Sequence, residues 1–399
     1  MIARALIPIL IITVMADACI TWRFMHRSRW WKKLLWWMPA LIIIGWAIRL
    51  AMQSGFVGDS QAEVEYFLLA FALIVVPKAV FAFCSLVGRL FVIGKRRRKR
   101  NYGNLVGLVG VLFTWYVVLY GTFVGFYQLE VRHVEVTSAD LPTAFDGYRI
   151  VQFSDIHVGT LNGKRQRILK RMVDSINAQK ADMVVFTGDL QNTEPQDIYP
   201  HLDLLSTVKA PDGVYSILGN HDYAYYVDCD DAIKVANCRE TASLERQMGW
   251  TLLNNNNRRI HRDHAPTSSA HQRHHGGDLI IAGMENDGEN RFPHLGNLRQ
   301  ALAGVRDHEF VVMLEHDPTA WRQIIQPASH TQLTLSGHTH AAQFKLFGWS
   351  PASLRYREWD GLYQEGDQYL YVSAGVSGLI PFRFGVPGEI VVITLRAAP

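Results

Sequence analysis

Four long apolar stretches near the start of the chain limit its fold more than any other feature. They occupy residues 5–22, 34–52, 66–91 and 105–127. A helix needs about 20 apolar residues to cross the hydrocarbon core of a bilayer, and in lipid a helix satisfies its own backbone hydrogen bonds. A cleaved signal peptide would be followed by soluble sequence, not by three further apolar stretches. We therefore expect residues 1–127 to form an all-α bundle of four transmembrane helices.

The charge of the chain is divided unevenly between its two parts. Residues 1–127 carry 15 Lys and Arg against 4 Asp and Glu, whereas residues 128–399 carry 25 against 32. A nucleic-acid-binding protein places its basic residues along a recognition surface, but here they lie between apolar stretches. The composition therefore argues against nucleic acid as a partner and indicates a membrane topology.

Lys and Arg in short loops mark the cytoplasmic side of a membrane. Residues 23–33 and 95–100 are strongly basic, whereas residues 55–65 contain three acids and no Lys or Arg. The fourth stretch then runs outward, so we expect an integral protein of a plasma or bacterial inner membrane with an extracytoplasmic domain at 128–399. Asp17 and Lys78 fall inside apolar stretches, where pairing would ease insertion; a transport role is the alternative.

The second part of the chain contains five apolar runs that each end in Asp, Asn or His. Residues 163–179 have helical spacing of apolar residues and lie between the first two runs, which predicts a β-α-β unit. In α/β sheets, functional groups gather at the carboxyl ends of the strands. The polar residues at these ends are Asp155 and His157, Asp189, Asn220 with His221 and Asp222, His316, and His338 with His340.

These side chains offer oxygen and imidazole nitrogen but no thiolate. Such a set suits Mn, Fe or Zn better than copper or an iron–sulfur cluster. Two divalent ions that share a carboxylate stabilise both the attacking and the leaving oxygen in phosphoryl transfer. A shared ligand needs two oxygens, so one of the Asp residues must supply it.

The ordered motifs D-x-H, GD, GNHD, H and GHTH resemble the calcineurin-like metallophosphoesterase superfamily, in particular its membrane-anchored bacterial phosphodiesterases. The resemblance covers roughly residues 148–396 and implies a four-layer αββα sandwich, an α/β fold, for the domain at 128–399. It also implies two divalent metal ions (Mn, Fe or Zn) and a metal-bound hydroxide as nucleophile.

The same resemblance assigns roles to individual residues. One ion would be held by Asp155, His157 and His340, and the other by Asn220, His316 and His338, with Asp189 bridging them. His221 would stabilise the transition state or protonate the leaving oxygen, and Asp222 would orient the His221 ring.

The expected activity is hydrolysis of a phosphoester or pyrophosphate. Tethering to a membrane raises the local concentration of lipids, so a lipid-linked substrate is favoured, with membrane lipids as further partners. Soluble nucleotides or wall-polymer phosphodiesters are the alternative substrates. A non-catalytic membrane sensor is disfavoured, because no ligand of the motif set is missing.

Several features leave alternatives open. The related proteins commonly read GHTHGGQ, whereas Ala341 and Ala342 replace both glycines here, which raises the question of the loop's shape. Arg383 would meet either a substrate phosphate or an acid such as Glu389. The five histidines of residues 261–275 indicate a mobile surface loop rather than a metal-scavenging site. Residues 344–363 are aromatic and basic, and form either a packed surface insertion, the favoured interpretation, or a lipid-facing lid.

Cys229 and Cys238 are the cysteines outside the apolar stretches. An extracytoplasmic compartment permits disulfides, so a bond between them is predicted. Nine residues of continuous helix would hold the two Cα atoms roughly 13 Å apart, beyond the reach of a disulfide. The bond and an unbroken helix therefore exclude each other.

Overall fold

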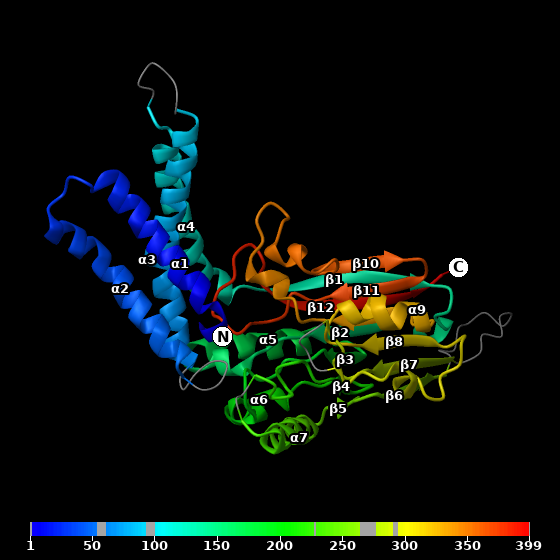
Figure 1. The fold of residues 1–399 in the computed structure, drawn as a ribbon. Helices are drawn as coiled ribbons and strands as arrows, with labels where there is room; N and C mark the ends of the chain where they lie inside the picture. Colours follow the sequence, from blue (N-terminus) through cyan, green and yellow to red (C-terminus); the bar gives the residue numbers. More distant parts are fainter. Residues whose placement is uncertain are drawn as a thin grey trace. The chain divides into compact units, whose positions relative to one another are not determined.

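The computed structural model of the chain describes residues 2–53, 61–92, 100–226, 229–263, 277–289 and 294–398 (Figure 1). Contacts within the chain define two compact units, residues 1–124 and 125–399. Much of the loops at 55–65 and 95–100, and most of the histidine-rich segment 261–275, lies outside the described residues.

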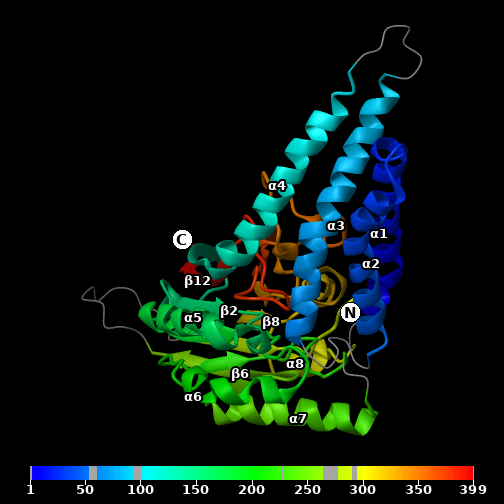
Figure 2. The ribbon, with the colours of Figure 1, turned by 90° about the vertical axis from the view of Figure 1, so that its left-hand side faces the viewer.

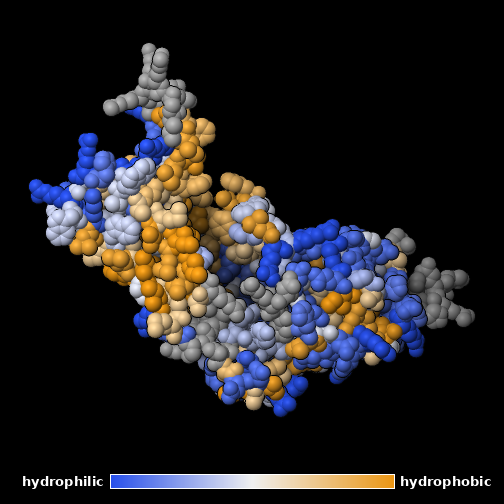
Figure 3. Space-filling model, viewed as in Figure 1, coloured by the Kyte–Doolittle hydropathy of each residue, from blue (hydrophilic) through white to orange (hydrophobic). Residues whose placement is uncertain are grey.

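The first unit is built from four helices. They are α1 (Ile2–Phe24), α2 (Trp30–Ala51), α3 (Gln61–Leu90) and α4 (Gly103–Phe123). All four are long and apolar enough to cross a membrane, as the sequence predicts. Hydrophobic residues cover most of their visible surface in the space-filling view (Figure 3).

Asp17 and Lys78, the two charges inside these helices, form an ion pair. The Lys78 ammonium lies 2.9 Å from Oδ1 of Asp17 and 4.6 Å from the centre of the Trp36 ring. Asp17 is fully buried. Pairing removes much of the cost of an isolated charge inside a membrane, so the expected pairing is confirmed.

The second unit contains two six-stranded sheets. The first has the order β1-β12-β2-β3-β4-β5 and the second β10-β11-β9-β8-β7-β6. Strands of the first sheet are β1 (Leu129–Ser138), β2 (Arg149–Phe153), β3 (Met183–Phe186), β4 (Val214–Ser216), β5 (Thr251–Leu252) and β12 (Gly388–Ala397). Strands of the second are β6 (Asn256–Arg262), β7 (Gly277–Gly283), β8 (Phe310–Leu314), β9 (Leu333–Ser336), β10 (Gly361–Glu365) and β11 (Gln368–Val372).

The two sheets pack face to face, with helices on their outer faces (Figures 1 and 2). Apolar side chains of both sheets, such as Ile150, Val185 and Leu335, form the core between them. The outer face of the first sheet packs against α5 (Gln166–Ala178), α6 (Leu202–Leu205) and α7 (Asp231–Gln247). That of the second packs against Trp321, Ile325 and the short helix α8 (Leu298–Ala301); α9 (Gln326–Ala328) follows Ile325 and buries no residue. The four layers are those of the expected αββα sandwich.

The helix predicted at 163–179 is α5, which buries Leu169, Met172, Val173 and Ile176. Burial of one apolar stripe, and not helix propensity, fixes this element on the sheet.

The predicted disulfide between Cys229 and Cys238 is wrong. Both residues are free cysteines. Helix α7 runs without a break from Asp231 to Gln247 and includes Cys238, while Cys229 precedes its first turn. A continuous helix carries the two thiols apart along its axis, which is the condition that rules the bond out.

An ion pair between a partly exposed arginine and a buried glutamate joins the paired strands β1 and β12. The Arg132 guanidinium lies 3.0 Å from the Glu389 carboxylate and 3.4 Å from Asp360. The Glu389 side chain is 1% exposed. Its carboxylate also accepts a hydrogen bond from the Tyr371 hydroxyl at 2.7 Å.

We predict that Arg132→Met lowers the free energy of unfolding of the second unit by about 2–3 kcal/mol, because it leaves the buried Glu389 charge uncompensated. Arg396, whose partner Glu135 is 63% exposed, provides the matched control: Arg396→Met is expected to change stability by about 0.5 kcal/mol or less. Thermal denaturation of the full chain in detergent measures both, and equal losses would contradict the assignment.

Candidate metal centre

The carboxyl ends of strands from both sheets bring the predicted ligands together. One group consists of Asp155, His157, Asp189 and His340, and a second of Asp189, His316 and His338. Within each group the donor atoms all lie within 4.8 Å of one another. Asp189 belongs to both groups, which is the arrangement that a bridging carboxylate requires.

In the first group, a hydrogen bond at Nδ1 of His157 leaves the other ring nitrogen, Nε2, facing the candidate metal centre. Its Nδ1 lies 3.2 Å from the carbonyl oxygen of Gln191. A carbonyl only accepts, so Nδ1 carries the proton and Nε2 presents a lone pair. Nε2 is buried without a hydrogen-bond partner and lies 3.6 Å from Oδ2 of Asp189. A buried, unpartnered acceptor beside a carboxylate is what an imidazole ligand of a metal ion leaves when the ion is removed.

His316 follows the same pattern in the second group. Its Nδ1 lies 2.7 Å from the carbonyl oxygen of Thr187, which directs Nε2 towards Asn220 Oδ1 at 3.0 Å and Asp189 Oδ2 at 3.3 Å. His338 places Nδ1 at 2.7 Å from the same Asn220 oxygen. The Asn220 side chain thus lies between both histidines, as expected of a third ligand.

The electrostatics of the centre favour bound positive charge. Burial tends to raise the pKa of Asp189, but the surrounding imidazoles, His316 first, lower it well below its usual value. Burial tends to lower the pKa of His316, but Asp189 raises it to about 10. His157, by contrast, has its pKa lowered to about 3 by burial. A divalent cation would compete with the proton on His316 for the same carboxylates.

The backbone at the centre is strained. Asp155, His157, Asp189, His338 and His340 all have positive φ angles, between 46° and 72°. Such conformations cost non-glycine residues free energy and cluster at functional sites. Gly337 also allows a close approach, because a Cβ there would lie 2.3 Å from Oδ2 of Asp155. The backbone conformations that bring these side chains together therefore lower the local stability of the fold.

Ala341 and Ala342, which stand where the related proteins commonly have two glycines, both adopt left-handed backbone conformations. Their φ angles are 48° and 50°, in the left-handed region that glycine occupies without cost. The two alanines are therefore strained in a conformation that glycine would adopt without this cost.

We predict that Ala342→Gly stabilises the chain by about 0.5–1 kcal/mol, because it removes the steric cost of a Cβ at positive φ. Ala178→Gly, at the exposed end of α5, is the control and is expected to destabilise by a similar amount. Thermal denaturation distinguishes them; destabilisation by both would show that Ala342 is not strained.

His221 lies beside the first group, with its ring centre 4.9 Å from that of His157. Its Nδ1 is 2.6 Å from the carbonyl oxygen of Asn192. The resemblance assigns Asp222 to orient this ring, but its carboxylate instead accepts backbone N–H groups of Asp189, Gly219, Leu190 and Gln191. Asp222 therefore positions the backbone around Asp189, and the Asn192 carbonyl orients the ring.

Among the described residues, Arg383 binds backbone carbonyls and forms no ion pair with Glu389, one of its two expected partners. The side chain is fully buried, and its guanidinium donates to the carbonyl oxygens of Ala374 at 2.8 Å, Gly375 at 2.9 Å and Ser377. Burial lowers its pKa to about 10. Arg383 thus holds the loop after β11, and the backbone N–H groups of Val376 and Ser377 in that loop bond to the carbonyls of Ser154 and Asp155.

Two residues that the sequence motifs do not include, Tyr356 and Asp317, lie beside His338. Nε2 of His338 lies 3.0 Å from the hydroxyl of Tyr356 and 3.4 Å from Oδ2 of the buried Asp317. They face the ring nitrogen opposite to the one near Asn220, the position from which outer partners orient a metal-binding imidazole. Asp317 directly follows the candidate ligand His316, and this position in the sequence could have indicated a role for it. No sequence pattern singles out Tyr356.

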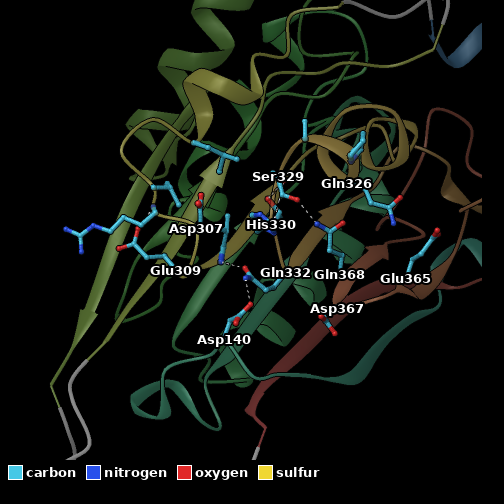
Figure 4. Close-up of a pocket in the computed structure, with 17 residues that line it drawn as sticks. Asp140, Asp307, Glu309, Gln326, Ser329, His330, Gln332, Glu365, Asp367 and Gln368 are labelled. Carbon is cyan, nitrogen blue, oxygen red and sulfur yellow. Dashed lines mark hydrogen bonds between the residues drawn. The ribbon is translucent and has the colours of Figure 1, made fainter.

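A polar cleft of about 760 Å³ lies elsewhere in this unit, at the opposite, amino-terminal ends of β8, β9 and β11 (Figure 4). Gln332, at its centre, donates to Asp140 and accepts from the backbone of Val311. None of the candidate ligands lines it, so it is separate from the metal centre.

A buried cluster of carboxylates and imidazoles, built around one shared carboxylate on an αββα sandwich, defines a metallophosphoesterase. Comparison with known proteins agrees: the family model Calcineurin-like phosphoesterase matches residues 148–342, and the model Probable Calcineurin-like phosphoesterase, transmembrane domain, matches residues 3–126. The chain belongs to the calcineurin-like metallophosphoesterases, and it is an integral membrane enzyme that acts on phosphoester bonds and is expected to use divalent metal ions.

Relatives cover most of the chain. The Uncharacterized metallophosphoesterase YkuE of Bacillus subtilis is 30% identical over 320 residues, 76% of this chain and 99% of its own. A Transmembrane protein with metallophosphoesterase domain of Danio rerio is 28% identical over 345 residues, 83% of this chain and 74% of its own. Among solved structures, TT1561 of Thermus thermophilus is similar over 58% of this chain and 90% of its own, at 15% identity and with a TM-score of 0.33.

We predict that Asp189→Asn lowers phosphoester hydrolysis by several orders of magnitude and reduces the bound metal, because an amide offers one good oxygen and no charge to two cations. Asp212→Asn is the control, since Asp212 accepts a hydrogen bond from Tyr148 and belongs to neither ligand group. Elemental analysis of the purified variants measures the metal; near-normal turnover by Asp189→Asn at saturating metal would refute a shared carboxylate.

Proposed function

We propose that this chain hydrolyses a phosphodiester or pyrophosphate of a lipid-linked substrate at a dinuclear centre of Mn, Fe or Zn. The observation that supports it most is that Asp189 belongs to both groups of candidate ligands. Asp155, His157 and His340 would hold one ion and Asn220, His316 and His338 the other. When bound, two such ions would lower the pKa of a water molecule and stabilise the attacking and leaving oxygens.

The chain's own residues prepare this chemistry. The Gln191 and Thr187 carbonyls fix the tautomers of His157 and His316, so the other nitrogen of each ring faces the centre. The Asn192 carbonyl, at 2.6 Å, holds the His221 ring beside the first group. Because Nδ1 donates to this carbonyl, Nε2 is the His221 nitrogen that would give a proton to the leaving oxygen and regain one from water.

The lipid preference is argued from the membrane helices. A catalytic unit tethered by residues 124–128 to the end of α4 meets substrates in the same bilayer at a high effective concentration. We assign residues 1–127 to a membrane domain and 128–399 to the catalytic domain. Soluble nucleotides and wall-polymer phosphodiesters are the competing substrates.

A substrate panel tests this proposal. The purified full chain is assayed with phospholipids, nucleotide-linked lipids and soluble diesters, each with Mn, Zn and Fe. Selective turnover of a lipid supports the proposal, whereas selective turnover of soluble nucleotides over every lipid would overturn the lipid preference.

We predict that His221→Ala lowers the rate by about 10²–10⁴-fold, the usual contribution of a general acid, while metal content stays near that of the wild type. His294→Ala, an imidazole with a 60% exposed side chain paired to Asp287, serves as the control and should retain activity. Loss of one metal equivalent from His221→Ala would make His221 a ligand instead.

The catalytic unit is proposed to face the extracytoplasmic side, from the distribution of Lys and Arg between the apolar stretches. We predict that a reporter active only outside the cytoplasm is active when fused after residue 399. Activity of a cytoplasmic reporter at the same position, with silence of the first, would reverse the topology.

A further inference from the structure

A loop beside the metal centre carries exposed apolar side chains that the mechanism does not use. In this loop, residues 346–357, Leu346 and Trp349 form an antiparallel bridge that closes a two-residue turn. The turn consists of Phe347 and Gly348, whose φ angles are 50° and 80°. The segment extends away from the sheets (Figure 1).

The tip of the 346–357 loop is apolar and lies in the open. Phe347 is 99% exposed, Leu354 80% and Trp349 49%. Arg355 and Arg357 are exposed on the same loop. An aromatic residue held at positive φ with its whole side chain in solvent gains neither favourable backbone geometry nor burial within the unit. The tip therefore does not fit the packed surface insertion that the sequence favoured.

The base of the loop, by contrast, is firmly attached. The Ser350 hydroxyl donates to the carbonyl of Ala341 at 2.6 Å, and Lys345, just before the loop, lies 2.5 Å from the Asp360 carboxylate. Tyr356, within the loop, places its hydroxyl 3.0 Å from Nε2 of His338. One short segment thus connects the exposed tip to a candidate ligand of the metal centre.

We propose that the 346–357 loop inserts its tip into the lipid surface of the bilayer that holds the membrane helices. The composition fits this partner: Phe and Leu enter the acyl boundary, Trp prefers the interface, and Arg pairs with anionic headgroups. A bilayer is also close along the chain, because only residues 124–128 separate the last apolar helix from β1. A loop inserted in this way would bring lipid headgroups to the metal centre. The catalytic assay below, unlike the contact itself, rests on the proposed function.

Photo-crosslinking tests the contact without reference to activity. The photoreactive analogue p-benzoylphenylalanine replaces Phe347 in the full chain, which is then reconstituted in nanodiscs of phosphatidylethanolamine and phosphatidylglycerol. The control carries the analogue at Asp367, an exposed position between β10 and β11 at the opposite ends of the strands. We expect phospholipid adducts by mass spectrometry at least about tenfold more abundant at position 347.

A second assay asks whether the contact serves catalysis. The paired substitution Phe347→Ser and Leu354→Ser is compared with wild type on a lipid-linked phosphodiester in nanodiscs and on a soluble diester. We expect the mole fraction of lipid substrate that gives the half-maximal rate to rise by about tenfold, because the apolar tip no longer inserts. The KM for the soluble diester is expected to change much less.

The outcomes separate the two proposals. Absence of lipid adducts at position 347, or adducts with protein alone, would overturn the membrane contact whatever the activity. Lipid adducts from a chain that hydrolyses no lipid would keep the contact and refute the lipid substrate. A soluble KM that rises as much as the lipid requirement would show that the loop acts only on the metal centre.

Discussion

The candidate metal centre depends on one buried carboxylate, that of Asp222, which accepts backbone hydrogen bonds from the loops after two strands. Asp222 accepts N–H groups from Asp189 and Gly219 at 2.8 and 2.9 Å, and from Leu190 and Gln191 at 2.9 and 3.1 Å. These bonds tie the loop after β3 to the loop after β4. They hold Asp189 at a positive φ, between the two groups of histidines. The position of Asp189, which belongs to both groups of candidate ligands, is thus set by a residue outside those groups.

A second layer of backbone contacts extends this arrangement. Arg383 donates hydrogen bonds to the carbonyls of the loop after β11. In the same loop, the Val376 N–H donates to the carbonyl of Ser154, the residue before Asp155. Carbonyls of Gln191, Thr187 and Asn192 set the proton positions of three imidazoles. The loops therefore hold one another through contacts of the chain itself, which brings together candidate ligands that are far apart in the sequence.

Much of this could be predicted from sequence, because apolar strands that end in Asp, Asn or His are local patterns. The ligand groups around Asp189 and the helix α5 follow from such patterns. The outer contacts could not be predicted in the same way. Asn192 acts through its backbone carbonyl, which every residue possesses, and Tyr356 reaches His338 from a loop whose path no periodicity describes. The role expected for Asp222 and the Glu389 ion pair considered for Arg383 were wrong for the same reason, since both side chains bind backbone atoms.

The central claim is that two metal ions share Asp189. It is tested most directly by electron paramagnetic resonance of the metal-free full chain titrated with Mn²⁺. Two ions about 3.5–4 Å apart with a common ligand are magnetically coupled. The account predicts that two equivalents bind and give an exchange-coupled spectrum. Saturation at one equivalent, or two equivalents with the six-line spectrum of isolated ions, would contradict it.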